Sequence, residues 1–420
     1  MDSSPHIRPG HDVFIDNGFL PPDLPLEALP NPYFEPWETI ATNIVSLVST
    51  RKLRGAIQSM PVLSTEELTS EAEWRRAYVL LVFIIQAYVW SESTPEEIIP
   101  PSISIPLLEI VAHFDLPPAA TYTGFCLWNY KVLDPARSSE DPANLATLLT
   151  FTGTEDEEWF FLTSVAIEAR GARMISQLLR ILWAADQNDT KAATIQLQAF
   201  REDLRGVTTV LSRVRERCQP HVFYHHLRPF LNGTKNMSQE GLPRGVIFDD
   251  GTGFQEYRQY SGGSNAQSSL IQLFDIALGI EHEPSAGSFM EDMRQYMPGD
   301  HRRFLEDMTT VGNIRDYVAQ NGQDEELEQM YGLALDALRE LRDVHLHIVT
   351  QYIVAQSSTP LGDMDTSAVN RRTDVASSTM NQPGGKSQTN SSGVLRGTGG
   401  TPLIQFLKKV RDGVVGIGRR

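Results

Sequence analysis

The sequence predicts an all-α protein, and three observations support this fold class. Hydrophobic residues make up 41% of the 420 residues and charged residues 21%, a composition typical of a globular chain. Several long stretches carry apolar side chains at alternating steps of three and four residues, the spacing that places them on one face of a helix. Signals for strands are scarce, since only residues 245–248 look extended.

The first forty residues are rich in proline and aromatic residues, with six prolines between positions 21 and 36. Prolines at this density prevent helices and sheet ladders, so we expect an extended strap that crosses the surface of a core. Helical periodicity takes over after Trp37. The helices expected in this part of the chain cover residues 39–60, 64–89 and 106–114, with loops around 95–101 and 134–142.

A second helical block begins near Glu155. Residues 155–185 start with acidic side chains and carry arginines further on, which suits the dipole of a helix. Further helices are expected over residues 190–218, 268–280 and 288–296. The clearest helix covers residues 324–356, where one apolar seam continues along its whole length. The residues of this seam are Leu327, Tyr331, Ala334, Leu338, Leu341, His345, Ile348 and Tyr352.

Residues 357–400 are rich in Ser, Thr, Gly and Asn and contain few apolar side chains, so we expect a mobile surface insert. A short amphipathic helix follows it. Residues 396–420 carry six basic side chains and one acidic side chain, a net charge of +5. A solvated helix face explains this charge more simply than a docking patch.

The charge balance excludes several classes of function. The chain has 53 acidic and 36 basic residues, a formal net charge of −17, and such a surface repels nucleic acid. Its two cysteines, Cys126 and Cys218, form neither a zinc motif nor a disulfide framework. The N-terminus lacks a signal pattern, and the longest apolar run, residues 78–90, is too short to cross a bilayer. We therefore expect a soluble cytoplasmic protein with neither nucleic acid nor membrane as a partner.

Two nearby histidines on the clearest helix have different environments. His345 falls on the apolar seam, whereas His347 falls on the polar face, so the pair cannot bind one metal ion together. A lone histidine on an apolar seam is usually a core residue. The alternative is an axial ligand to a large apolar cofactor such as haem, which needs one neutral imidazole in a hydrophobic slot.

Four further motifs could contribute to a binding site. The string HVFYHHLRPFL at residues 221–231 could hold an aromatic amino acid between its rings and Arg228, or it could be an ordinary helix with surface histidines. The small residues of SGGSNAQSS at 261–269 would let the backbone approach a flat ligand closely. GTGG at 397–400 is either a hinge or part of a lid. GGKS at 384–387 lacks the first glycine of a phosphate loop, because Met380 stands in that position.

These strings in this order resemble the indoleamine 2,3-dioxygenase family. The matching strings are FLPP, PYFEPWE, LPPAATYTGFCLWNYK, WFFLTS, FYHHLRPFLNG, GGSNAQSS, MRQYMP, LRDVHLHIVTQYI and GTGGT. The resemblance covers nearly the whole chain. It implies a smaller, mainly helical N-terminal domain (residues 1–151) and a large helical haem-binding domain (residues 152–420), with a lid insert at about residues 357–400.

The resemblance also implies a reaction. Family members insert both atoms of O2 across the indole 2,3 double bond of L-tryptophan and form N-formylkynurenine, on the route to NAD. One haem b per chain, an electron donor that keeps the iron ferrous and a monomeric state are implied with it. Two alternatives stay open: a low-turnover member that acts as a haem-linked signalling protein, and an enzyme for another indoleamine.

The residue roles below are implied by the resemblance alone. His345 matches the proximal ligand of the haem iron, and Arg342, Asp275 and Ser264 match residues near the cofactor. Ser164 and Arg228 match residues at the reacting molecules, with Arg228 binding the amino-acid carboxylate. The positions on the substrate side are Tyr122, Phe125, Cys126, Phe160, Phe223, Tyr224, Arg228, Ser264, Asn265, Ala266 and Thr398.

Some of these positions depart from the animal members of the family. Phe125 and Cys126 stand where those members usually carry a cysteine and a small aliphatic residue. Asn265 and Ala266 replace Ala–Gly, and Tyr224 replaces a phenylalanine. Each change adds bulk or polarity near the substrate, so we expect the affinity for substituted indoles to differ from that of the animal enzymes.

Overall fold

The structure is a computed structural model, and it describes residues 13–358 and 403–414. Its main elements are helices, which confirms the predicted all-α class. The α-helices are α1 (Val13–Asn17), α2 (Glu35–Thr42), α3 (Ile44–Ser49), α4 (Leu53–Gln58), α5 (Glu71–Trp90), α6 (Pro101–His113), α7 (Glu155–Asp186), α8 (Thr190–Ser212), α9 (Val214–Arg217), α10 (Pro220–Val222), α11 (Ser269–Leu278), α12 (Pro284–Arg294), α13 (Gly299–Thr310), α14 (Ile314–Gln320), α15 (Glu325–Val349) and α16 (Leu403–Gly413).

The strands are short. Strand β4 (Val246–Phe248), at the predicted extended segment, pairs in parallel with β1 (Ile98–Ile99) and antiparallel with β5 (Tyr257–Arg258). A separate antiparallel pair joins β2 (Tyr130–Val132) to β3 (Leu145–Thr147). Of these five strands the sequence predicted only β4, because two or three residues are too few to show an alternating pattern.

The helix predicted over residues 39–60 is wrong, since the chain forms the three short helices α2, α3 and α4 there. Arg51 adopts a φ of 55°, a left-handed conformation that ends a right-handed helix. Helix α5 begins at Glu71 rather than at residue 64, because the Ser70 side chain accepts a hydrogen bond from the Glu73 amide and caps its first turn.

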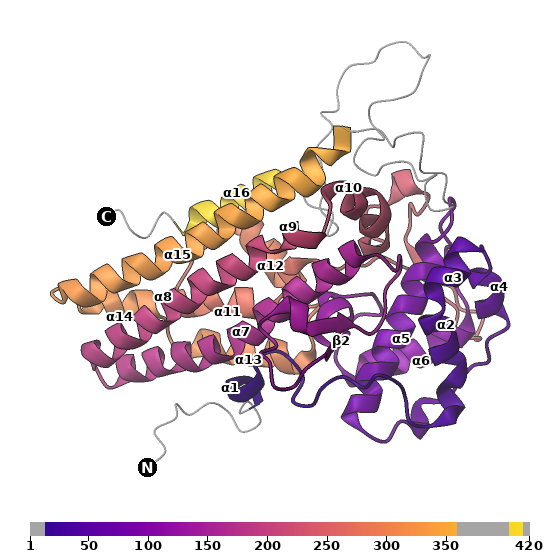
Figure 1. Cartoon of the computed structure of the whole chain (residues 1–420), viewed down its shortest axis with the longest axis horizontal. Coiled ribbons are helices and arrows are strands. Elements are labelled where there is room, and N and C mark those ends of the chain that lie inside the picture. Colours follow the sequence, from indigo (N-terminus) through magenta and orange to yellow (C-terminus); the bar gives the residue numbers. More distant parts are fainter. Residues whose placement is uncertain (1–12, 359–402, 415–420) are drawn as a thin grey trace, which may run out of the picture.

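The long helices α7, α8 and α15 lie side by side, away from the group of helices α2–α6 (Figure 1). Helix α8 packs against α7 on one side and against α15 on the other. The predicted bounds of α7 agree with the structure to within one residue, because Thr154 caps its first turn and four acidic residues follow. Helix α8 ends at Ser212, six residues before the predicted end.

Buried apolar side chains form two cores. One core joins the helices α2–α6 to the start of α7 and to residues 210–248. The other joins the end of α7 to α8, α11, α13, α14 and α15. Helix α7 belongs to both: Trp159 and Phe161 lie in the first, and Met174 and Leu178 lie in the second. The division into domains at residues 151 and 152 stays a prediction.

The seam of α15 is confirmed by burial, because Leu327, Tyr331, Ala334, Leu338 and Leu341 are all buried. The helix begins after its Asp324 cap and continues into a π-helical turn, Thr350–Val354. Helix α16 lies along α15 (Figure 1). The predicted mobile insert at 357–400 falls outside the described residues, apart from its first two positions.

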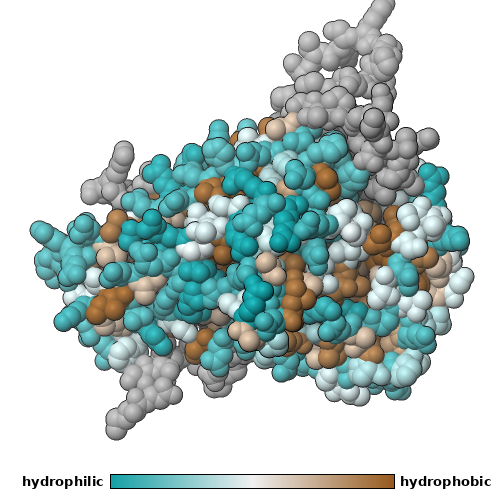
Figure 2. Space-filling model, in the orientation of Figure 1, coloured by the Kyte–Doolittle hydropathy of each residue, from teal (hydrophilic) through white to brown (hydrophobic). Residues whose placement is uncertain are grey.

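The face of the molecule seen in Figure 2 is mainly polar. Figure 2 shows hydrophilic residues over most of the visible face, with apolar residues in small groups. Within residues 13–358 and 403–414, no helix is both long enough and apolar enough to span a bilayer.

Candidate functional site

His345 and His347 differ in burial as the seam predicts. His345 is half-buried between the buried residues Leu341 and Ile348, whereas His347 is exposed. Burial lowers the pKa of His345 to about 4, so its imidazole is neutral near neutral pH. A neutral imidazole inside the protein is the form that binds a metal ion.

Arg342 lies one helical turn before His345 and holds three elements together. Its guanidinium pairs with Asp275 on α11, and its Nη1 donates to the Val410 carbonyl of α16 over 2.8 Å. Its Nε atom is buried and has no hydrogen-bond partner among the described residues. The Asp275 carboxylate also lies 2.8 Å from His282 Nε2. Burial alone would raise the pKa of Asp275, but Arg342 and His282 lower that pKa below its usual value.

Arg228, which the sequence singled out as a carboxylate ligand, lies beside an aromatic ring. The rings of Phe160 on α7 and Phe223 on a π-helical turn (Phe223–Leu227) lie 4.8 Å apart between centroids. Arg228 follows this turn and is only 4% exposed. Its guanidinium carbon lies 5.3 Å from the centroid of the Tyr224 ring. The structure thus places the buried Arg228 cation beside the Tyr224 ring and packs Phe160 against Phe223, the residue before Tyr224 on the same turn.

A second group of predicted residues lies against α7. Tyr122 precedes a π-helical turn (Thr123–Leu127) that packs against this helix. Burial raises the pKa of both the Tyr122 hydroxyl and the Cys126 thiol far above their usual values, while hydrogen bonds from Ser164 lower them slightly. Ser164 itself is 8% exposed. Tyr122 and Cys126 therefore stay protonated near neutral pH.

Sequence reasoning missed Glu168, a buried carboxyl group in the same place. The Tyr122 hydroxyl donates to Glu168 Oε1 over 3.0 Å, and burial raises the pKa of Glu168 to about 7 despite hydrogen bonds from Ser268 and Tyr122. The position was open to inference, because Glu168 follows Ser164 by four residues on a helix and so shares its face.

The small-residue loop is built around Gln267. The Gln267 side chain accepts hydrogen bonds from the Tyr122 amide (2.9 Å) and the Ser264 amide (3.4 Å). Ser264 in turn caps the short turn Asn265–Gln267 by accepting from the Ala266 amide. Ser264 and Ala266 are half-buried and Asn265 is exposed, so of the two departures in this loop Ala266 lies closer to the interior.

Glycines let this loop approach its neighbours. A Cβ atom on Gly263 would lie 2.6 Å from the Phe125 ring, and one on Gly262 would lie 2.1 Å from the Leu231 carbonyl oxygen. The Phe125 ring also packs against Phe161, Phe83 and Phe151, with centroids 5.7 to 5.8 Å away. Phe125 is therefore part of the aromatic core behind the loop, and Cys126 is the neighbour of Ser164. Thr398 lies outside the described residues.

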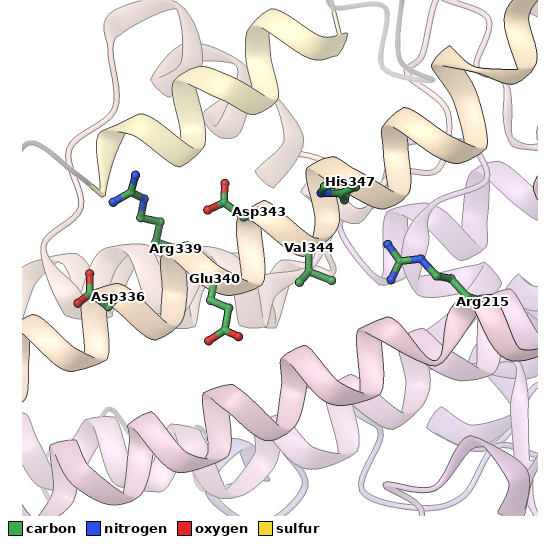
Figure 3. A pocket seen from close by; sticks show the side chains of 7 residues that line it. All are labelled: Arg215, Asp336, Arg339, Glu340, Asp343, Val344 and His347. Atoms are coloured by element: carbon green, nitrogen blue, oxygen red, sulfur yellow. The ribbon is translucent and has the colours of Figure 1, made fainter.

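A groove of about 590 Å³ lies on another side of α15. It is lined by Arg215, Asp336, Arg339, Glu340, Asp343, Val344 and His347, and Figure 3 shows Arg215 on a separate helix from the other six. None of the residues predicted for the site lines this groove, so it is distinct from the candidate site.

Comparison with known proteins decides the family. The family model for indoleamine 2,3-dioxygenase matches residues 9–415. The chain belongs to the indoleamine 2,3-dioxygenase family. This confirms the resemblance inferred from the motifs and makes the chain an oxidoreductase of the dioxygenase class.

Three similar proteins illustrate the range of the indoleamine 2,3-dioxygenase family. An indoleamine 2,3-dioxygenase of Penicillium citrinum is 41% identical over 405 residues, which cover 94% of this chain and 85% of that protein. The indoleamine 2,3-dioxygenase of Saccharomyces cerevisiae is 38% identical, covering 95% and 91%. A 6-hydroxytryptophan 2,3-dioxygenase of Fusarium equiseti is 36% identical, covering 96% of both chains.

The residues of α15 fit a haem, the cofactor expected from membership of the indoleamine 2,3-dioxygenase family. Haem would need one protein nitrogen for its iron, because the porphyrin itself supplies four, and neutral His345 has that chemistry. Its propionates need hydrogen-bond donors. The Arg342 Nε atom, buried and without a partner among the described residues, is such a donor one turn away.

Proposed function

We propose that this protein is a haem-dependent dioxygenase that inserts both atoms of O2 across the indole 2,3 double bond of L-tryptophan and forms N-formylkynurenine. The observation that carries the proposal is the buried Arg228 guanidinium beside the Tyr224 ring, on a turn whose first residue, Phe223, packs against Phe160. A cation among aromatic rings suits a ligand with both a carboxylate and an indole. In this role the enzyme would supply N-formylkynurenine to the kynurenine route, which leads to NAD.

The residues of this chain would bind and orient the two reactants. Haem b, one per chain, supplies the activation of O2 when it is bound. His345 would hold its iron, and Arg342, in its pair with Asp275, would bind a propionate. Arg228 would bind the substrate carboxylate, while Phe160 and Phe223 would pack against the indole ring. Ser264 and Ala266 border the same site from the loop.

Tyr122 and Cys126, which interact with Ser164, would not take a proton from the substrate. The pKa of Tyr122 and that of Cys126 are both raised far above the usual range by burial, so neither group is a base near neutral pH. This agrees with a reaction in which the indole nitrogen keeps its proton. We also propose that the protein works as a cytoplasmic monomer, with an electron donor that keeps the iron ferrous.

A second candidate substrate is an indole amino acid that carries a ring hydroxyl. The relative from Fusarium equiseti is named for 6-hydroxytryptophan. Ser164, Tyr122 and Cys126 offer hydroxyl and thiol groups that can pair with such a hydroxyl. A site that pairs a substrate hydroxyl discriminates strongly against the analogue that lacks it.

One assay tests both candidates. Purified ferrous protein is mixed in air with L-tryptophan or with 6-hydroxytryptophan, and the absorbance of the formylkynurenine product is followed. We expect L-tryptophan to give the higher kcat/KM. A higher kcat/KM for 6-hydroxytryptophan would favour the second candidate. Haem-loaded protein that forms neither product would contradict both and favour the signalling alternative.

A further inference from the structure

Glu168 connects two segments of the candidate site, the turn that begins at Tyr122 and the start of α11 at Ser268. Its Oε1 atom accepts hydrogen bonds from the Tyr122 hydroxyl over 3.0 Å and from the Ser268 hydroxyl over 2.7 Å. Tyr122 leads into the π-helical turn that carries Cys126, and Ser268 caps the first turn of α11 after the small-residue loop. These two segments are 146 residues apart in sequence at Tyr122 and Ser268, so neither holds the other through local structure.

Gln267 joins the same two segments, but through their backbones. Its side chain accepts from the Tyr122 amide and donates to the Gly262 carbonyl over 2.9 Å each. Gln267 thus places the backbone of the loop, whereas Glu168 places the Tyr122 ring and the start of α11. Removing the Glu168 contacts would leave the loop attached but would release the Tyr122 side chain.

The surroundings of the second oxygen of Glu168 favour the neutral form of its carboxyl group. Glu168 is 1% exposed, and its Oε2 atom has no hydrogen-bond partner among the described residues. A charged carboxylate with an unpaired buried oxygen is costly, so the neutral form is favoured. Burial raises the pKa of Glu168 to about 7, although hydrogen bonds from Ser268 and Tyr122 lower it. Burial also raises the pKa of Glu157, whose oxygens are both paired, to about 7.

Among the described residues, no basic side chain shifts the pKa of Glu168 or pairs with it. The titratable groups facing it from the π-helical turn are Tyr122 and Cys126, and both are neutral near neutral pH. On α11 the group in contact is the Ser268 hydroxyl. Arg170, two residues along α7, pairs instead with Glu140 and with Asp203 on α8. No basic side chain is among the groups that shift the pKa of Glu168.

We propose that Glu168 is a positioning residue of this site, whose carboxyl group fixes the Tyr122 side chain and the Ser268 cap at the border of the indole site and keeps that border dry while the group is neutral. The inference rests on the proposed function for its substrate. Ionisation spreads a negative charge over both carboxyl oxygens, and Oε2 has no partner among the described residues. The hydrogen bonds from Tyr122 and Ser268 favour the charged form and persist, so the carboxylate must draw in water at Oε2. This water wets a border of the site against which an apolar ring would pack.

The same helix offers a matched control. Glu157 is also fully buried on α7, but both of its oxygens accept hydrogen bonds: Oε1 from the Phe151 amide, and Oε2 from the Thr152 amide and hydroxyl. In Glu168→Gln, the amide oxygen can keep both hydrogen bonds while the NH2 group takes the place of the unpaired oxygen. In Glu157→Gln, the NH2 group must replace an oxygen that accepts from the backbone.

The test measures KM and kcat for L-tryptophan from about pH 6 to about pH 8.5. In the wild type we expect KM to rise roughly tenfold across this range, with kcat changed much less, because ionisation of Glu168 weakens binding. Glu168→Gln should match the wild-type KM at the acid end and remove the rise. Tyr122→Phe, which loses only one of the two hydrogen bonds, should raise KM by roughly fivefold at the acid end. Glu157→Gln should keep the wild-type pH profile of KM.

A second measurement does not need turnover. Because folding raises the pKa of Glu168 from 4.5 to about 7, the folded form binds more protons within this window and loses stability as pH rises through it. The unfolding equilibrium constant of the haem-free wild type should therefore rise roughly a hundredfold more than that of Glu168→Gln between about pH 5 and about pH 8.

The two measurements separate the possible failures. Equal pH slopes of unfolding in the wild type and Glu168→Gln overturn the positioning role, whatever the enzyme does. A KM profile that is the same in both proteins overturns it as well, while the proposed function stands. If the haem-loaded wild type forms no product, the proposed function fails, and the unfolding slopes still decide the charge state of Glu168.

Discussion

Buried ionisable side chains near the site differ in how completely their polar atoms are paired. Both oxygens of Glu157 accept hydrogen bonds, whereas one oxygen of Glu168 and the Nε of Arg342 have no partner among the described residues. Unpaired buried polar atoms are rare in native proteins and usually have a function. We therefore expect a proton on the Glu168 carboxyl group and a ligand at the Arg342 Nε atom.

The first prediction at this scale concerns the iron ligand. His345→Ala should abolish haem binding, because it removes the one neutral imidazole that α15 presents to the interior. The Soret absorbance of protein reconstituted with haem measures this. The control is His347→Ala, whose side chain is exposed two residues away and should leave the band unchanged. A full Soret band in His345→Ala would show that another residue holds the iron.

The second prediction concerns the carboxylate of the substrate. Arg228→Ala should lower kcat/KM for L-tryptophan by roughly ten- to a hundredfold, the loss of a charge-assisted hydrogen-bond pair worth about 1.5–3 kcal/mol. Haem content should stay unchanged. Arg215→Ala removes an arginine whose Nε donates to Gln351 outside the site, and it should keep wild-type kinetics. Unchanged kinetics in Arg228→Ala would exclude this residue as the carboxylate ligand.

At the scale of the element, a single helix provides the frame of the site. Phe160, Ser164 and Glu168 follow one another at intervals of four residues on α7, so all three project from one face. The π-helical turns before Trp128 and after Val222 pack against the same helix. The loop at 262–268 closes the arrangement, and its approach depends on glycine.

The third prediction tests that approach. Gly263→Ala should destabilise the protein, because its Cβ would lie 2.6 Å from the Phe125 ring, and overpacking of this kind costs about 1–3 kcal/mol. Phe125→Leu in the same chain should recover part of the loss by making room. A denaturant midpoint measures both. Gly332→Ala is the control, because a Cβ there meets nothing within 4 Å. Additive effects of Gly263→Ala and Phe125→Leu would contradict the contact.

The elements show where sequence patterns suffice and where they fail. Helices α7 and α15 follow from caps and long apolar seams. Helix α13 was missed because only Phe304, Leu305 and Met308 among its apolar side chains are buried, too few for a clear period. The break at Arg51 has no signal in the sequence, since arginine ordinarily continues a helix.

The site divides in the same way. The seam placed His345 on the buried side of its helix without any structure. Helix spacing places Glu168 on the face of Ser164, but its pairing could not be inferred from the sequence, because its partners Tyr122 and Ser268 lie 46 and 100 residues away. Only the fold brings them together, and the pKa of a carboxyl group depends on those neighbours rather than on its own helix.

At the scale of the whole molecule, α16 joins the rest of the protein through a few contacts. The Phe406 ring lies 4.5 Å from that of Phe289 on α12, and Lys409 pairs with Glu283 over 2.8 Å. Arg342 holds the Val410 carbonyl. None of the α16 side chains at 403–413 is fully buried, so this helix has the contact pattern of an element that opens without global unfolding.

The fourth prediction follows from these contacts. Phe406→Ala should speed amide hydrogen exchange in α16 by roughly three- to tenfold, because an aromatic pair contributes about 0.5–1.5 kcal/mol beyond its buried area. Exchange in α7 and α8 should stay unchanged. Phe254→Ala, a substitution at an exposed ring, serves as the control. Equal exchange in α16 of the wild type and Phe406→Ala would show that polar contacts alone hold the helix.

The membership of α7 in both cores limits how this chain can be divided. A fragment that ends before α7 would lack Trp159 and Phe161 and would expose the first core, and a fragment that begins within α7 would lose the capped start of the helix. Cutting the chain at the predicted boundary of residues 151 and 152 therefore separates the first core from residues 210–248, which complete it. We therefore expect that neither half buries its core without the other, so the two halves should be expressed and engineered as one piece.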